Sequence, residues 1–528
     1  FCRFEKANVE DLLFAAYRVT LARITGANRR RTIPLDRESV DEGEHNDEVM
    51  LSPEARAISL SYFEVLIVDD VNEQQERWLK SNIDGMRRPE DPYYYAAVVV
   101  PSLEDALIAV LFNHNIQAIV VRPGLTLKSK NDNEILTKYL RNASDADHID
   151  TMQPEDYGPE LCRLIARVRP ELDAYLVTGR SAEDIAGLKL GNCRRVFYNQ
   201  EDFMELHLNI LRGVGLRHKS PFFTALVEYS KQPTGVFHAL PISRGKSITR
   251  SHWIQDMGAF YGPNIFLAET SATSGGLDSL LEPQGPIKEA QELASRAFGS
   301  KQTFFATNGT STCNKIVVQA LVRPGDIVLV DRDCHKSHHY GMVLAGAEVL
   351  YLDSYPLNEY SMYGAVPLRE IKHQLLQLKA AGKLDRVRML LLTNCTFDGL
   401  VYNVERVMEE CLAIKPDLVF LWDEAWFAFA RFSPTYRQRT AMRTANDLRA
   451  RFRTEKHKQK YEAQQKALTD ASEEELLNTR LVAPPNSRVR AYATQSTHKT
   501  LTSLRQGSMI HVNDQDFKGE VEQSFHEA

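Results

Sequence analysis

One lysine in this sequence has the surroundings of a nucleophile. Ser496-Thr497-His498-Lys499 follows residues 489–494, whose alternating apolar positions predict a β-strand. A lysine at the end of a buried strand loses contact with water, which lowers the pKa of its ammonium group. The neutral amine that results forms Schiff bases with aldehydes. Lys499 is therefore a candidate for covalent chemistry, although most lysines that follow a strand are solvated and do none.

A second stretch is typical of phosphate binding. Residues 303–307 predict a strand, residues 308–312 a polar Gly-Thr-Ser turn, and residues 315–321 a helix. Free backbone N–H groups, the helix dipole and the hydroxyls of Thr310 and Ser311 would then point at one place. Small polar turns are also common without any ligand, so this motif is weak on its own.

Two further strand ends carry groups that suit a flat ring containing a nitrogen. The apolar strand over residues 418–422 ends at Asp423. A carboxylate at such a position must be paired or hydrogen-bonded to stay charged, and a cationic ring nitrogen would serve. The strand over residues 327–330 is followed by His335, whose imidazole suits stacking against a planar ligand.

Zinc is an alternative for the same region, because Cys334, His335, His338 and His339 lie close together in the sequence. A catalytic zinc ion needs three protein ligands, usually drawn from more than one segment. The sequence holds no second Cys/His pair at metal spacing. We therefore favour a stacking imidazole and predict no metal site.

The elements that must position these groups are strands of one sheet. Five predicted strands end in polar groups, at 308–311, His335, Thr396, Asp423 and 496–499. Open α/β sheets bind ligands at the carboxyl ends of their strands. One ligand would use all of these groups if it had a phosphate, a flat ring to stack on, a basic ring nitrogen and an aldehyde for the lysine. That ligand is pyridoxal phosphate. A purely structural role for every one of these groups would require five coincidences.

The motifs around these residues resemble the successive signatures of the bacterial-type ornithine/lysine/arginine decarboxylases. The similarity covers residues 260–528, and its most specific part is the Ser-x-His-Lys block that ends at Lys499. The matching stretches are 309–311, 331–337, 394–399, 423–426 and 494–499. The resemblance implies a fold-type-I, aspartate-aminotransferase-like α/β domain that binds pyridoxal phosphate, preceded by a wing domain.

The resemblance also implies catalytic roles for four residues. Lys499 would hold the cofactor as a Schiff base, with His498 beside it. Asp423 would keep the pyridine nitrogen protonated, and His335 would stack on the ring. Lys499 or His498 would return a proton to Cα after CO₂ leaves.

Contacts to the cofactor follow from the same resemblance. Thr310, Ser311 and Ser496 would bind the phosphate, and Trp426 would line the ring edge near the phenolic oxygen. The complete set of cofactor-binding side chains is Thr310, Ser311, His335, Asp423, Trp426, Ser496, His498 and Lys499.

The implied reaction is decarboxylation of a basic amino acid (lysine, arginine or ornithine) to its amine and CO₂, within amino-acid and polyamine metabolism. The implied assembly is a homodimer or a larger homo-oligomer. Two alternatives stay open, namely another fold-type-I reaction such as transamination, and a regulatory homologue without catalysis. The family's Thr-Pro-Gly-His and Asp-x-Ser elements are altered at residues 238–245 and 269–271, so the sequence leaves the substrate open.

The first part of the chain predicts a separate, smaller domain. Strands alternate with helices, which favours a doubly wound α/β fold, and the strands lie near 63–68, 96–100, 117–121 and 174–177. Asp69 and Asp70 follow the first strand, as the acidic pair does in bacterial receiver domains. Arg122 stands where a receiver has its phosphoacceptor aspartate. We therefore predict a receiver-like domain without phosphorelay chemistry.

These observations predict four segments. An N-terminal helix and a flexible acidic linker occupy residues 1–58, the receiver-like wing domain residues 59–213, and a linker residues 214–259. The pyridoxal-phosphate domain takes residues 260–528. We expect it to lack its C-terminal part and to carry a charged, solvated insertion over residues 437–486.

Composition limits the partners and the compartment. The 528 residues carry a net charge of −6, which gives no overall basic footprint for nucleic acid. No apolar run approaches the roughly 20 residues that a membrane span needs. The seven cysteines include no CxxC pair, which indicates free thiols in a reducing compartment. We predict a cytoplasmic protein that binds neither nucleic acid nor membranes.

Overall fold

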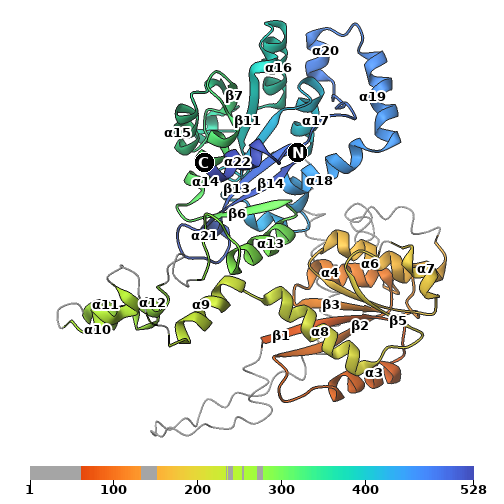
Figure 1. The fold of residues 1–528 in the computed structure, drawn as a ribbon. Coiled ribbons are helices and arrows are strands. Elements are labelled where there is room, and N and C mark those ends of the chain that lie inside the picture. The colour runs from red at the N-terminus through yellow and green to blue at the C-terminus, as the bar shows by residue number, and fades with distance from the viewer. Residues whose placement is uncertain are drawn as a thin grey trace. The chain divides into compact units, whose positions relative to one another are not determined.

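The computed structural model describes residues 61–131, 152–188, 190–233, 235, 242–251, 255–269 and 277–528. The predicted N-terminal helix and acidic linker lie outside the described residues, as do residues 238–241 and 270–271 of the two altered family elements. The chain divides into two compact units, one that ends at Lys219 and one that begins at Ser220 (Figure 1). Each unit is described by itself.

The first unit is built on a five-stranded parallel sheet with the order β2-β1-β3-β4-β5. The strands are β1 (Ser61–Val68), β2 (Tyr93–Val100), β3 (Ile116–Val121), β4 (Asp173–Thr178) and β5 (Cys193–Tyr198). This order is the one found in receiver and flavodoxin-like doubly wound domains. The predicted receiver-like fold is therefore confirmed.

Helices cover both faces of this sheet because successive strand residues point to opposite sides. Leu66 and its neighbours on one face pack against α4 (Leu103–Phe112) and α6 (Tyr157–Val168). Ile67 and its neighbours on the other face pack against α3 (Glu73–Gly85) and α8 (Phe203–His218). A short helix, α7 (Ala182–Ala186), precedes β5. Burial on both faces explains why β1 to β4 are mostly apolar, whereas the edge strand β5 carries the exposed residues Arg194 and Arg195.

The acidic end of β1 is neutralised by two basic side chains. Nη1 of Arg122 lies 2.6 Å from Oδ2 of Asp69, and its Nε lies 2.9 Å from Oε1 of Glu201. Nζ of Lys130 lies 2.6 Å from Oδ1 of Asp70. The residue that replaces the phosphoacceptor thus holds the first aspartate in an ion pair.

The second unit is built on a seven-stranded sheet with the order β6-β14-β13-β12-β11-β7-β8. Its strands are β6 (Gln302–Ala306), β7 (Ile327–Asp331), β8 (Glu348–Leu352), β11 (Val387–Thr393), β12 (Val419–Asp423), β13 (Arg490–Ser496) and β14 (Ser508–Asp514). Strand β14 runs antiparallel to both of its neighbours, and the other adjacent pairs are parallel. A small hairpin of β9 (Pro356–Leu357) and β10 (Met362–Tyr363) stands apart.

Helices also cover both faces of the larger sheet. Leu421 faces a core shared with α14 (Thr310–Leu321), α15 (Lys336–Ala345) and α22 (Glu520–Glu527). Phe420 and Trp422 face the opposite core, shared with α16 (Leu368–Ala380), α17 (Val404–Ile414) and α18 (Ala441–Phe452). Both units are therefore α/β layers, and the predicted fold class is confirmed.

The ends of two helices show where local sequence signals set a helix boundary. Helix α13 (Pro286–Phe298) ends at Gly299, whose φ of 75° is the left-handed conformation that glycine adopts most easily. Helix α8 instead continues to His218, beyond the predicted domain end at 213. Its buried residues Leu206, Ile210 and Val214 keep helical spacing across that point.

The segment predicted as a linker, residues 214–259, is largely helical where the structure describes it. It contains α9 (Pro221–Lys231), α10 (Lys246–Thr249) and most of α11 (Gln255–Tyr261), and α12 (Asn264–Leu267) follows. Tyr229 and Phe266 are buried in this region. The predicted linker is therefore helical where it is described, and its role in joining two domains stays a prediction.

The predicted solvated insertion, residues 437–486, is only partly solvated. Helix α18 buries Ala441, Met442, Ala445, Leu448 and Phe452 in the core of the larger sheet. The following helices, α19 (Glu455–Ala467) and α20 (Glu473–Asn478), bury little more than His457 and Leu477. The charged residues of α19 and α20 dominated the composition of the segment and hid a core helix.

Within the described ranges, none of the helices is both long enough and apolar enough to cross a lipid bilayer.

Candidate active site

The carboxyl ends of the parallel strands form one edge of the larger sheet. Thr393, Asp423 and Thr494 are register partners on β11, β12 and β13. A pocket of about 470 Å³ lies at this edge. All of the predicted site residues line it: Thr310, Ser311, His335, Asp423, Trp426, Ser496, His498 and Lys499. The structure thus brings the predicted residues together, and their individual roles stay predictions.

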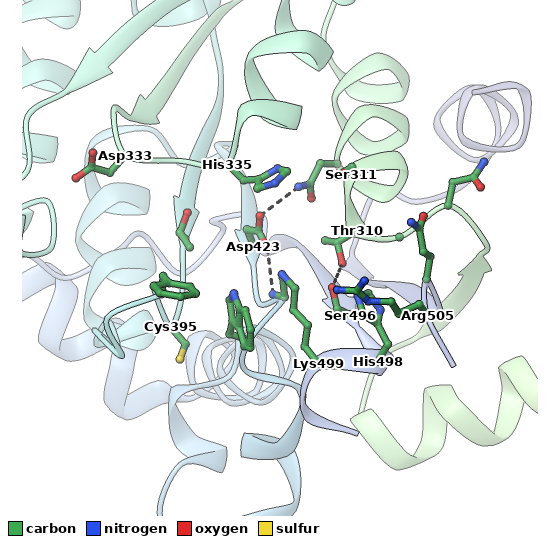
Figure 2. A pocket seen from close by; sticks show the side chains of 18 residues that line it. Thr310, Ser311, Asp333, His335, Cys395, Asp423, Ser496, His498, Lys499 and Arg505 are labelled. Atoms are coloured by element: carbon green, nitrogen blue, oxygen red, sulfur yellow. Dashed lines mark hydrogen bonds between the residues drawn. The ribbon is translucent and has the colours of Figure 1, made fainter. Parts of the chain in front are cut away.

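Lys499 enters the pocket from a single helical turn, α21 (Thr497–Thr500), which follows β13 directly. Its Nζ lies 4.5 Å from the centroid of the Trp426 ring. Figure 2 shows the side chain running toward Asp423. Burial lowers the pKa of Lys499 below its ordinary value, and the nearby carboxylate of Asp423 opposes that shift. The amine is therefore more easily deprotonated than that of a solvated lysine.

Asp423 is held as a carboxylate although its side chain is almost completely buried. Its Oδ2 lies 2.8 Å from Nε2 of His338 and accepts a hydrogen bond from Nδ2 of Asn314 at 3.1 Å. Its Oδ1 accepts the backbone N–H of Ala425 at 3.0 Å. Burial by itself raises the pKa of Asp423, but the bonds from His338, Ala425 and Asn314 outweigh burial and leave it below its ordinary value.

Sequence reasoning missed Asn314 and His338 as partners of Asp423. Asn314 lies four residues after Thr310 on α14, and its Oδ1 accepts the hydroxyl of Thr494 at 2.6 Å. His338 lies three residues after His335. Each missed residue is thus one helical turn beyond a predicted one, and that spacing was the available signal.

The hydroxyl groups of two strand ends meet on one side of the pocket. Oγ1 of Thr310 lies 2.5 Å from Oγ of Ser496. Gly309 caps α14 with a φ of 75°, and its N–H donates to the carbonyl of Gln506 at 2.9 Å. The first N–H groups of α14 have no partner within the helix. These hydroxyls and N–H groups form a site suited to an anion.

Arg505 lines the same side of the pocket and was also missed. Figure 2 labels it on the same side of Lys499 as Ser496. No carboxylate within the described ranges forms an ion pair with it. The loop that carries Arg505 is held by the Gln506 bond to Gly309 and by Gly507, whose carbonyl accepts the N–H of Thr497 at 3.0 Å. A Cβ at Gly507 would come within 2.4 Å of Oγ1 of Thr497, so any other residue here would displace that hydroxyl.

The two histidines of the predicted site are each fixed by one ring nitrogen. His335 is the N-cap residue of α15, and its Nδ1 accepts the N–H of Ser337 at 3.2 Å. Burial lowers the pKa of His335, which favours the neutral imidazole. Nδ1 of His498 lies 3.0 Å from the carbonyl oxygen of Gly507. A carbonyl only accepts, so Nδ1 of His498 carries the proton in this contact.

The residues that suggested zinc point in different directions. His338 turns to Asp423, while His339 lies 3.5 Å from Sγ of Cys334 and 3.2 Å from the hydroxyl of Tyr351. In the part of the chain that the structure describes, no group of three or more His, Cys, Asp and Glu side chains is arranged to hold a metal ion.

The predicted contribution of Thr396 was wrong. Its Oγ1 accepts the N–H of Leu400 at 3.1 Å and its own N–H donates to the carbonyl of Leu400, so the side chain closes its own turn. Thr393 and Cys395 line the pocket instead. Cys395 has a φ of 70°, and this left-handed conformation redirects the chain directly after β11.

Glu424 links the strand ends near the pocket through hydrogen bonds. Its Oε1 accepts the N–H of Ala441 at 2.8 Å and Nδ2 of Asn394 at 3.2 Å, and its Oε2 accepts Nε2 of Gln495 at 3.0 Å. It therefore joins the ends of β11, β12 and β13 to the start of α18. Burial raises the pKa of Glu424 to about 6.

The fold and the pocket define an α/β protein with a lysine, a buried carboxylate and an anion site at the carboxyl edge of a mixed sheet. The family model described as "Orn/Lys/Arg decarboxylase, major domain" matches residues 220–483. This chain belongs to the Orn/Lys/Arg decarboxylase family, as its sequence motifs predicted.

Individual relatives share part of the chain. The lysine decarboxylase LdcA of Pseudomonas aeruginosa is 35% identical over 370 residues, which cover 67% of this chain and 44% of the relative. The biodegradative arginine decarboxylase of Escherichia coli is 29% identical over 303 residues, covering 56% and 35%. The solved structure of lysine decarboxylase A from Pseudomonas aeruginosa matches 88% of this chain and 56% of that chain, with 28% identity and a TM-score of 0.46. The chain spans about half the length, or less, of these relatives.

Proposed function

We propose that this chain carries the cofactor-binding part of a pyridoxal-phosphate-dependent decarboxylase that acts on lysine, arginine or ornithine. Membership of the Orn/Lys/Arg decarboxylase family supports the class of reaction. The observation that carries the proposal is the arrangement of one pocket. Lys499, the buried carboxylate of Asp423 and the Thr310–Ser496 hydroxyl pair all line it.

The donors and acceptors of this pocket fit pyridoxal phosphate. The cofactor has a phosphate dianion, a basic ring nitrogen, a phenolic oxygen and an aldehyde. The pocket offers hydroxyls and helix N–H groups for the phosphate, a carboxylate for the ring nitrogen and an amine for the aldehyde. Oγ1 of Thr393 is buried at its wall without a hydrogen-bond partner in the described structure, and so is available to a ligand. A volume of about 470 Å³ lies in the usual range for small-molecule sites.

We assign Thr310, Ser311, Ser496 and the cationic Arg505 to the phosphate. His335 and Trp426 are assigned to the faces and edge of the ring. When bound, pyridoxal phosphate supplies an electron sink for the negative charge that develops at Cα as CO₂ leaves.

The protein's own groups then have distinct tasks. Asp423 presents a fixed negative charge to the ring nitrogen, and this electrostatic contact contributes several kcal/mol in comparable sites, roughly 3–4. Burial lowers the pKa of Lys499 and so makes its amine easier to deprotonate, and the neutral amine is the nucleophile. We assign the return of a proton to Cα to Lys499 or to His498, whose Nδ1–H is held by the carbonyl of Gly507.

The substrate and the assembly are part of the proposal. The two curated relatives named above are a lysine and an arginine decarboxylase, so a basic amino acid is the substrate class to test. A homodimer or larger homo-oligomer, and a cytoplasmic location, follow from the family resemblance and the composition. A receiver-like wing domain without a phosphoacceptor would serve assembly or regulation.

The test is product analysis with purified protein, pyridoxal phosphate and each of the three basic amino acids. We expect release of CO₂ and the matching amine from one of them, and no release from a Lys499→Ala variant. Formation of a keto acid without CO₂ would overturn the proposal in favour of transamination. A protein that gains no visible absorbance from pyridoxal phosphate would instead be a regulatory homologue.

A further inference from the structure

His338 is a fully buried histidine that the proposed reaction does not use. It stands in the first turn of α15, one turn after His335, with 0% of its surface exposed. Its Nε2 lies 2.8 Å from Oδ2 of Asp423. It contacts the carboxylate of Asp423 without lining the pocket itself.

The two ring nitrogens of His338 differ in their hydrogen-bond partners. Nδ1 is buried and has no hydrogen-bond partner within the described structure. A proton on Nδ1 would leave a buried donor unsatisfied, which costs about 1–3 kcal/mol, and more for a charged ring. A bare Nδ1 lone pair costs less. An ionised carboxylate only accepts, so Nε2 of His338 carries the proton in its contact with Asp423.

We propose that His338 is a positioning residue that acts through Asp423. Its Nε2–H donates to Oδ2, and so keeps the carboxylate ionised and fixed in orientation toward the cofactor's ring nitrogen. This inference rests on the proposed function, because it concerns the same cofactor site. The second donor to Oδ2 is Nδ2 of Asn314, which itself is held through its oxygen by Thr494. Asp423 therefore rests on two buried side chains, one of which, Asn314, is itself held by Thr494.

The remaining ionisable groups near Asp423 are few. They come from α14, the segment before α15, the N-cap of α15, the end of β12 and α21, and they are Cys313, Cys334, His335, Glu424 and Lys499. The two thiols have pKa values raised to about 12 by burial, so they stay neutral. His335, Glu424 and Lys499 titrate in every variant considered below. A difference between a variant and the wild type therefore reports on Asp423 and His338.

The test compares His338→Leu with His338→Gln in the purified protein. Leucine removes the donor, while glutamine keeps an N–H group of similar reach. The readout is the equilibrium affinity for pyridoxal phosphate from about pH 5 to about pH 8, followed by the quenching of tryptophan fluorescence. We expect loss of the donor to raise the pKa of Asp423 in the leucine variant. That variant should then lose affinity for the cofactor about tenfold for each pH unit below that pKa. The glutamine variant should follow the wild-type profile.

A double-mutant cycle with Asp423→Asn separates this role from a merely structural one. Once Asp423 is uncharged, adding His338→Leu should cost no further affinity. Equal losses in both backgrounds, or a leucine variant whose pH profile matches that of the wild type, would overturn the inference. If thermal melting shows that His338→Leu does not fold, His338→Met provides an apolar replacement with a more flexible side chain. If wild-type protein itself binds no pyridoxal phosphate, the proposed function fails, and the two failures are thereby distinguishable.

Discussion

The hydroxyl oxygens of Thr310 and Ser496 lie 2.5 Å apart, although 186 positions separate them in the chain. The order of the sheet explains this contact. Strands β6 and β13, which lead to these two residues, are both neighbours of β14 and lie on either side of it. Both run antiparallel to β14, so their carboxyl ends reach the same edge. The anion site therefore depends on the one antiparallel strand of this sheet.

Arg505 provides a direct test of that anion site. Arg505→Gln should weaken binding of pyridoxal phosphate about tenfold, since a charge-assisted hydrogen bond at an exposed position contributes roughly 1.5 kcal/mol. Binding of pyridoxal, which lacks the phosphate, should not change. Arg505→Lys is the matched control and should restore part of the affinity. Equal weakening for both ligands would show that Arg505 does not contact the phosphate.

The lowered pKa of Lys499 predicts how fast the apoprotein reacts. Only the neutral amine attacks the cofactor aldehyde, so the rate of covalent attachment should rise with pH. Burial lowers the pKa of Lys499. The pH at which the rate is half-maximal should therefore lie below 10.5, the ordinary pKa of lysine. Stopped-flow absorbance measures the rate. Nα-acetyl-lysine, whose side-chain amine is free and solvated, is the control. A midpoint at or above that of the control would contradict the assignment.

The candidate site was predictable because it obeys a simple rule of topology. Parallel strands present their carboxyl ends at one edge, so polar residues after apolar strands had to meet there. Asp423, His335 and Lys499 could be found in this way. His338 and Asn314 could not, because their contact with Asp423 depends on how α15 and α14 are rotated against the sheet. The position of Arg505 depends on a loop that has no periodic pattern.

Much of the fold was predictable for a related reason, and its failures have a physical cause. Strands buried on both faces are short apolar runs, which stand out in a sequence. The burial of α18 was missed because its five buried apolar residues alternate with charged residues and are followed by two highly charged helices. The helices of residues 214–259 were missed because they are short, and short helices carry little periodicity.

Leu448 tests whether α18 belongs to the core. Its side chain is completely buried, so Leu448→Ala should lower the free energy of unfolding by about 2–5 kcal/mol. Gln465→Ala on the exposed face of α19 is the matched control and should change it by no more than about 0.5 kcal/mol. Urea unfolding followed by circular dichroism measures both. Similar small effects would place α18 on the surface.

Glu424 predicts a pH dependence of stability. Its pKa is raised from 4.5 to about 6, so the folded protein binds this proton more tightly than the unfolded chain does. Stability from this group is therefore present below about pH 4.5 and is lost as the pH rises through about 6, by about 2 kcal/mol in total. Glu424→Gln does not titrate and is the reference. The free energy of unfolding of the wild type minus that of the variant should fall by this amount between about pH 4.5 and about pH 7. A constant difference would rule out the raised pKa.

We propose that Lys499 binds the aldehyde of pyridoxal phosphate covalently. Asp423, which lines the same pocket, would face the ring nitrogen. Borohydride reduction of the protein with bound cofactor, followed by peptide mass spectrometry, measures this most directly. We expect one stoichiometric pyridoxyl adduct, on the peptide that contains Lys499, and loss of that adduct in Lys499→Ala. An adduct spread over surface lysines at equal levels, or no adduct at Lys499, would contradict it.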